Sequence, residues 1–176
     1  MSEGYRNKYV IPYSGLKTGI HLFEFLVDET FFEEIEYSEI KRGKLKVNVT
    51  LNKHESMLAF DFEIEGTIQV ECDRCLGLFY MPVNGKNRLI VKFGEVISEE
   101  SDELIIIPES EHKFSLDKYI FEYISLMVPM QHMHPDDENG DSTCDPEVVK
   151  LLENHRSKEN DPRWSALKNI NLDNNK

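Results

Sequence analysis

The sequence lacks a long apolar run. No stretch approaches the roughly 18 apolar residues that a membrane-spanning helix needs. The first residues, Met1-Ser2-Glu3-Gly4-Tyr5-Arg6, show no basic-then-apolar signal segment. Seven prolines and nine glycines in 176 residues are too few for a collagen-like or low-complexity chain. With 40% hydrophobic residues, the sequence predicts a globular, cytoplasmic protein with no membrane contact.

Cysteine is also scarce. Cys72, Cys75 and Cys144 are the only three, which is too few for a disulfide framework. In a reducing cytosol we expect them to be thiols or metal ligands.

Basic residues are outnumbered: 33 acidic against 20 basic side chains give a net charge of −13. The excess lies in the second half, since residues 1–94 hold 14 acids and 12 bases whereas residues 95–176 hold 19 acids and 8 bases. Negative charge repels nucleic acid, so any nucleic-acid contact is expected in the first half. The acidic half suits a basic protein partner, or it simply keeps the chain soluble.

Alternating apolar residues predict a series of strands. They are expected at residues 9–12, 20–27, 44–51, 58–72, 79–83, 87–93 and 104–107. Gly66 is expected to mark a bend or bulge within residues 58–72. Asn84-Gly85 predicts a hairpin turn between the two strands that flank it.

Helical spacing predicts helices at residues 28–36, 116–128, 146–154 and 162–170. Strands first and helices later predict the α+β class: a strongly twisted antiparallel sheet, arranged as a meander, with helices on one side and a partly flexible, acidic, helical C-terminal tail. We expect residues 1–130 to form the α+β core. Residues 131–176 are expected to form an acidic linker with short helices, because residues 131–144 contain few core-forming side chains.

The most distinctive motif is Cys72-Asp73-Arg74-Cys75. Two thiolates separated by two residues can bind one metal ion, as in half of a zinc site. His134 and Cys144 can complete a tetrahedron, with His132 as the substitute for His134. The alternative is a pair of thiols that only close a turn, near histidines that bind nothing. A redox role is disfavoured, because the pair follows an alternating strand and does not open a helix.

Catalytic motifs are missing: there is no GxSxG, no phosphate-binding glycine loop and no HExxH. We therefore expect neither an enzyme nor a small-molecule substrate. Candidate nucleic-acid-binding residues lie on the polar faces of the expected strands and beside the cysteine motif: Lys44, Lys46, Arg74, Arg88 and Lys92. The alternative is an ordinary solvated face. Trp164 and Leu167 form a short apolar stripe that either binds a partner or packs back on the domain.

Three segments together resemble the YceD-like family, known as large ribosomal RNA subunit accumulation proteins. They are Val70-Glu71-Cys72-Asp73-Arg74-Cys75-Leu76, then Phe114-Ser115-Leu116-Asp117 leading to Val128-Pro129, and finally Asp161-Pro162-Arg163-Trp164-Ser165-Ala166-Leu167-Lys168. The family's CxRC element falls on Cys72, Arg74 and Cys75. Many relatives have a cysteine-rich cluster after the helix, a second half of a metal site, where this sequence keeps only Cys144 with His132 and His134.

The resemblance implies a non-enzymatic bacterial factor required for accumulation of large-subunit ribosomal RNA. We expect it to bind a precursor of that RNA, a ribosomal protein, or both. The alternative is an acidic chaperone for a basic ribosomal protein that makes no RNA contact.

Overall fold

The computed structural model describes residues 8–95, 98–101 and 104–155. The chain divides into two compact units. The core unit comprises residues 1–71 and 78–132, and the cysteine unit comprises residues 72–77 and 133–176. The helix expected at residues 162–170, with Trp164 and Leu167, lies outside the described residues.

The elements of the core unit follow one another as β1 (Val10–Ile11), the 3-10 turn η1 (Tyr13–Gly15), β2 (Gly19–Val27), α1 (Glu29–Glu33), β3 (Gly43–Lys53), β4 (Met57–Glu71), β5 (Leu78–Gly94), β6 (Ser98–Ser101), β7 (Leu104–Pro108), β8 (Phe114–Ser115) and α2 (Asp117–Leu126). The cysteine unit contains α3 (Pro146–His155).

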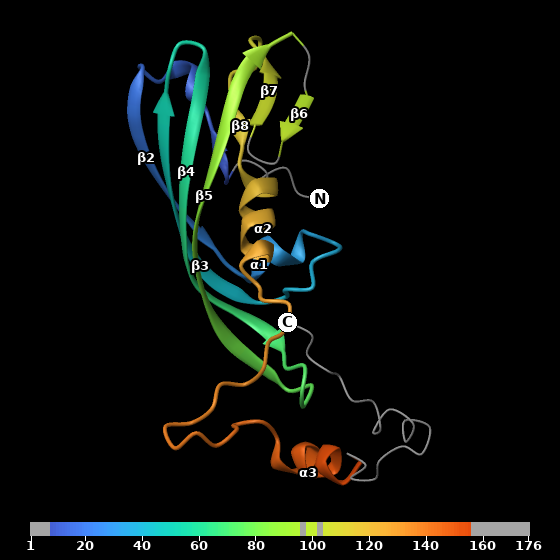
Figure 1. Ribbon diagram of the computed structural model, residues 1–176. Helices are drawn as coiled ribbons and strands as arrows, with labels where there is room; N and C mark the ends of the chain where they lie inside the picture. The colour runs from blue at the N-terminus through green and yellow to red at the C-terminus, as the bar shows by residue number, and fades with distance from the viewer. Residues whose placement is uncertain (1–7, 96–97, 102–103, 156–176) are drawn as a thin grey trace, which may run out of the picture. The chain divides into compact units, whose positions relative to one another are not determined.

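The main sheet has six strands in the order β2-β3-β4-β5-β7-β6 (Figure 1). Strands β2 to β5 are antiparallel neighbours, as expected. The predicted meander does not hold at β7, because this strand pairs with β5 in parallel. Strands β1 and β8 form a separate two-stranded sheet. The α+β class with a mainly antiparallel sheet is therefore confirmed.

The core lies between one face of the sheet and the helices. In β3 the alternate residues Leu45, Val47, Val49 and Leu51 are all buried, as their spacing predicts. Helices α1 and α2 cover the same face of the sheet (Figure 1), and α2 presents Ile120, Tyr123 and Ile124 to it. The Tyr123 ring meets the Phe62 ring edge-on at 5.1 Å. On the opposite face, β3 to β5 carry charged residues such as Lys44 and Arg88, whereas β2 adds the exposed Ile20, Leu22 and Leu26.

The prediction of a hairpin turn at Asn84-Gly85 is wrong. Both residues lie inside the 17-residue strand β5, where Asn84 pairs with Glu65 and Gly85 with Ile64 of β4. The long partner strand offers hydrogen bonds along the whole of β5, and these outweigh the local turn preference. Gly85 is suited to this position because a side chain there would stand 2.5 Å from the Met127 methyl carbon.

Gly66 lies inside one long strand, with its pairing to β3 and β5 unbroken. Its φ of 155° favours glycine, and an added Cβ would lie 2.2 Å from the Lys44 carbonyl oxygen. The residue therefore permits close approach of β3. Among the described residues, no helix is both long and apolar enough to cross a bilayer.

Candidate functional site

The two cysteines of the CxxC motif lie in the connection from β4 to β5. The Cys72 N–H donates to the Gly77 carbonyl at 2.9 Å, and the Leu76 N–H donates to the Cys72 carbonyl at 2.9 Å. Leu76 has a φ of 60°, the left-handed conformation that closes such a turn. We call residues 72–77 the knuckle. The turn leaves both thiols inside, since the exposed fraction is 0% for Cys72 and 8% for Cys75.

The other half of the site comes from the loop before α3. Asp136 and Ser142 form a bridge, and the Asp137 carboxylate accepts N–H bonds from Asn139 at 2.8 Å and Asp141 at 2.9 Å. Gly140, with a φ of 86°, completes the reversal of the chain. This tight loop brings together its two ends, where the candidate ligands His134 and Cys144 lie.

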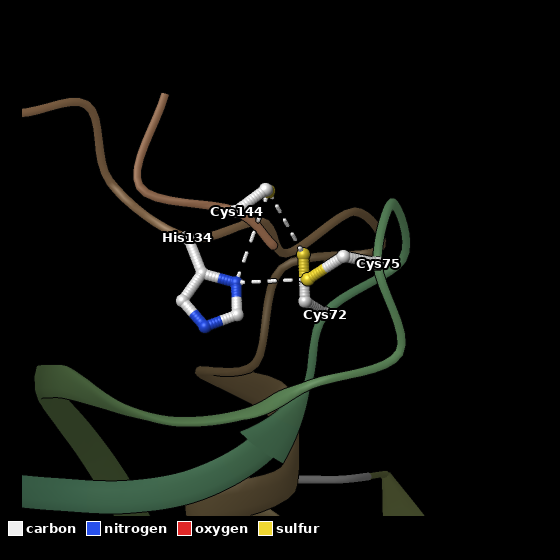
Figure 2. A group of neighbouring side chains, drawn as sticks. All are labelled: Cys72, Cys75, His134 and Cys144. Atoms are coloured by element: carbon white, nitrogen blue, oxygen red, sulfur yellow. Dashed lines mark hydrogen bonds between the residues drawn. The ribbon is translucent and has the colours of Figure 1, made fainter. Parts of the chain in front are cut away.

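The four predicted ligands Cys72, Cys75, His134 and Cys144 meet in one group, with all ligand atoms within 4.8 Å of one another (Figure 2). The Cys72 and Cys144 sulfurs are 3.7 Å apart. His134 Nδ1 lies 3.4 Å from the Cys75 sulfur and 3.8 Å from the Cys144 sulfur. A tetrahedral zinc ion with Zn–S bonds of about 2.3 Å requires sulfurs about 3.8 Å apart. These three separations therefore match the edges of a zinc-sized tetrahedron.

The surroundings of Cys72 favour its charged form. Burial raises the pKa of this thiol, but the backbone N–H groups of Cys75, Arg74 and His134 donate to the sulfur, and the His134 side chain adds a further hydrogen bond. The hydrogen bonds outweigh burial and lower the pKa of Cys72 to about 5. A thiolate held by N–H donors at neutral pH is the form that binds metal.

The pKa of Cys144 is raised, unlike that of Cys72, because the other sulfurs lie close to it. The Ser142 hydroxyl lowers the pKa of Cys144, whereas burial and the neighbouring Cys72 and Cys75 raise it, and the net shift is upward. Several thiolates in one small space repel one another, and a cation among them would remove that repulsion. The donor set of three sulfurs and one imidazole therefore suits a soft or borderline divalent ion such as zinc.

Two features of the site were not predicted from the sequence. Gly77 lies against the ligands: an added Cβ would stand 3.3 Å from His134 Cε1 and 3.4 Å from the Cys75 sulfur. A glycine two residues after a CxxC motif was the available signal. Arg74, expected to contact nucleic acid, donates to the Ser142 hydroxyl at 3.0 Å. His132 is not in the ligand group, and its Nδ1 lies 3.2 Å from the Pro129 carbonyl.

The other predicted nucleic-acid residues lie on the solvent face of the sheet. Lys44 and Lys46 come from β3, and Arg88 and Lys92 from β5. These strands are not neighbours, because β4 lies between them and contributes acidic residues to the same face: Asp61, Glu63 and Glu65. Ion pairs form across this face, Lys46 with Glu24 at 2.9 Å, Arg88 with Asp61 at 3.5 Å, and Lys86 with Glu63. Its cations are therefore interleaved with acids.

In a comparison with protein families, the model described as large ribosomal RNA subunit accumulation protein YceD matches residues 60–171. That range covers more than half of the chain. The chain belongs to the YceD family. All four candidate ligands of this YceD family member fall within the matched residues. Comparison with the curated proteins and with the solved structures gave no match.

Proposed function

We propose that this YceD family protein supports the accumulation of large-subunit ribosomal RNA by binding, without catalysis. The family match over residues 60–171 carries the proposal. The protein would act in the cytoplasm on a precursor of that RNA, on a ribosomal protein, or on both. No small-molecule substrate is involved in this mechanism.

The solvent face of β3 to β5 is the proposed RNA contact. Exposed ion pairs such as Lys46 with Glu24 contribute only about 0–1 kcal/mol, so a phosphate can compete for the cation. Among the described residues, Lys44 and Lys92 form no ion pair and remain open to phosphate. The acidic residues 131–176 would hold a basic ribosomal protein, which divides the work between the two halves of the chain.

Binding to fragments of large-subunit ribosomal RNA tests the RNA contact. Changing Lys44, Lys46 and Arg88 to Glu should weaken binding and lower the slope of log affinity against log salt by about 2, because each lost phosphate contact contributes about 0.7–0.9. The control reverses the exposed Lys17, Lys113 and Lys118, which lie off the sheet face and give the same change in net charge. An equal loss in both triple variants would contradict this contact.

The second candidate is an acidic chaperone for a basic ribosomal protein that never touches RNA. The described part of the cysteine unit favours this candidate, since it carries eight acidic and only two basic side chains. Retrieval of a ribosomal protein together with no RNA binding in the assay above would select this candidate.

We also propose that Cys72, Cys75, His134 and Cys144 bind one zinc ion. Native mass spectrometry should find about 65 Da of extra mass. The extra mass should disappear in Cys72→Ser and remain in His155→Ala, which changes an exposed histidine outside the ligand group. A redox enzyme would need Cys72 to exchange with substrate disulfides, and its complete burial opposes that reaction. Disulfide exchange that depends on Cys72 would reverse this choice.

A further inference from the structure

The cysteine unit has no apolar core among its described residues. Its buried residues there are Cys72, Cys75 and Cys144. Helix α3 buries none of its side chains, and Leu151 and Leu152 are 58% and 48% exposed. A compact unit normally gains its stability from buried apolar surface. Among the described residues of this unit, the buried side chains all belong to the candidate ligand group.

The knuckle and the loop that carries His134 and Cys144 are also joined by an exposed hydrogen bond. Apart from the ligand group, Arg74 donates to the Ser142 hydroxyl, and both residues are exposed. Such an exposed hydrogen bond contributes little against the entropy lost when a loop of this length is ordered. The hydrogen bonds of Asp137 are made within the loop and do not reach the knuckle.

The net charge of the cysteine unit also favours a bound cation. The described part of the unit carries eight acidic and two basic side chains, which gives it a net negative charge. A divalent ion bound among the three sulfurs and the imidazole would offset part of this negative charge.

We propose that metal binding is the folding step of the cysteine unit, so that metal occupancy switches residues 133–155 between an ordered and an unordered state. The inference rests on the zinc ligation proposed above. It adds that residues 133–145 and α3 become ordered only when the metal is bound. The core unit, which has its own apolar core, would keep its structure in both states.

Hydrogen exchange of the full-length protein, followed by mass spectrometry, tests the switch. One sample carries one equivalent of zinc and the other is treated with a chelator, both with a phosphine reductant so that no disulfide replaces the metal. The chelated sample should lose protection at the main-chain hydrogen bonds of the unit, donated by Cys72, Leu76, Asp137, Gly140 and Val149. Protection in β4 and β5 should not change.

Two variants make the test specific. Cys144→Ser should show the exchange pattern of the chelated protein even with zinc present, because one ligand is gone. His155→Ala, in the same unit but outside the ligand group, should behave like the wild type. Unchanged protection in β4 and β5 of each variant shows that the core unit has folded.

The outcomes separate this inference from the zinc proposal. If native mass spectrometry finds zinc but chelation leaves the exchange of residues 133–155 unchanged, the folding switch is wrong and zinc binding stands. If no zinc binds, both proposals are wrong. Wild-type protection in Cys144→Ser would also overturn the switch.

Discussion

Replacing Gly77 with alanine should weaken metal binding without unfolding the core unit. The backbone of Gly77 lies outside the left-handed region, so alanine can adopt it. The effect should come from contact alone, because the added methyl group would stand 3.3 Å from His134 Cε1 and 3.4 Å from the Cys75 sulfur.

The size of the effect follows from those distances. A Cβ at 3.3 Å forces the His134 ring to move by a few tenths of an ångström. Metal–ligand distances tolerate changes of only about 0.2 Å. Changes just outside the ligands typically reduce metal affinity by about 10- to 100-fold, or about 1.4–2.7 kcal/mol. We expect Gly77→Ala to fall in this range.

Competition for zinc with a chromophoric chelator measures the affinity directly. The matched control is Gly15→Ala, since a Cβ at Gly15 meets nothing within 4 Å and its φ is not left-handed. The control should bind zinc like the wild type. Wild-type affinity in Gly77→Ala would refute the reasoning, and an equal loss in both variants would point to a general effect of alanine.

Three further predictions concern pH and the core. Acidification should release zinc, because protons compete with the ion for the thiolates, and Cys72, whose pKa is about 5, loses its negative charge as the pH falls through that value. Zinc retained at pH 4 after dialysis would contradict this. Gly66→Ala should lower the free energy of unfolding by more than about 1 kcal/mol, since its Cβ would lie 2.2 Å from the Lys44 carbonyl oxygen. Urea denaturation measures this, with Gly15→Ala expected within about 0.5 kcal/mol of the wild type. Phe62→Ala should cost about 3–5 kcal/mol in guanidinium denaturation, because the ring is 1% exposed. A loss below about 1 kcal/mol would show that the core relaxes around the missing ring.

The strand faces could be predicted because alternation is a local property. Leu45, Val47 and Val49 are buried in β3 because residues two apart share a face. The error at Asn84-Gly85 arose where a distant partner decided the outcome. Strand β4 pairs with β5 along its length, and no pattern within residues 79–93 reveals that. The parallel pairing of β7 with β5 depends on the path of the chain in the same way.

Only one half of the candidate ligand group has a strong sequence signal. The spacing of Cys72 and Cys75 fixes one half of the site, because two residues between cysteines allow both sulfurs to face one ion. The choice of His134 over His132 depends on how the loop folds, and the two histidines look alike in sequence. The N–H groups that donate to the Cys72 sulfur could not be predicted, because every residue except proline has a main-chain N–H and the sequence does not show where it points.

The separation of the site's two halves along the chain has a consequence for synthesis. Cys144 follows Cys72 by 72 residues, and α2 ends before His134 is reached. Because chains emerge from the N-terminus onward, the strands and α2 can assemble on the nascent polypeptide while the ligand set is still incomplete. The zinc binding proposed for this site would therefore be a late step of synthesis, and zinc starvation should leave a protein whose sheet is complete but whose cysteine unit is unordered.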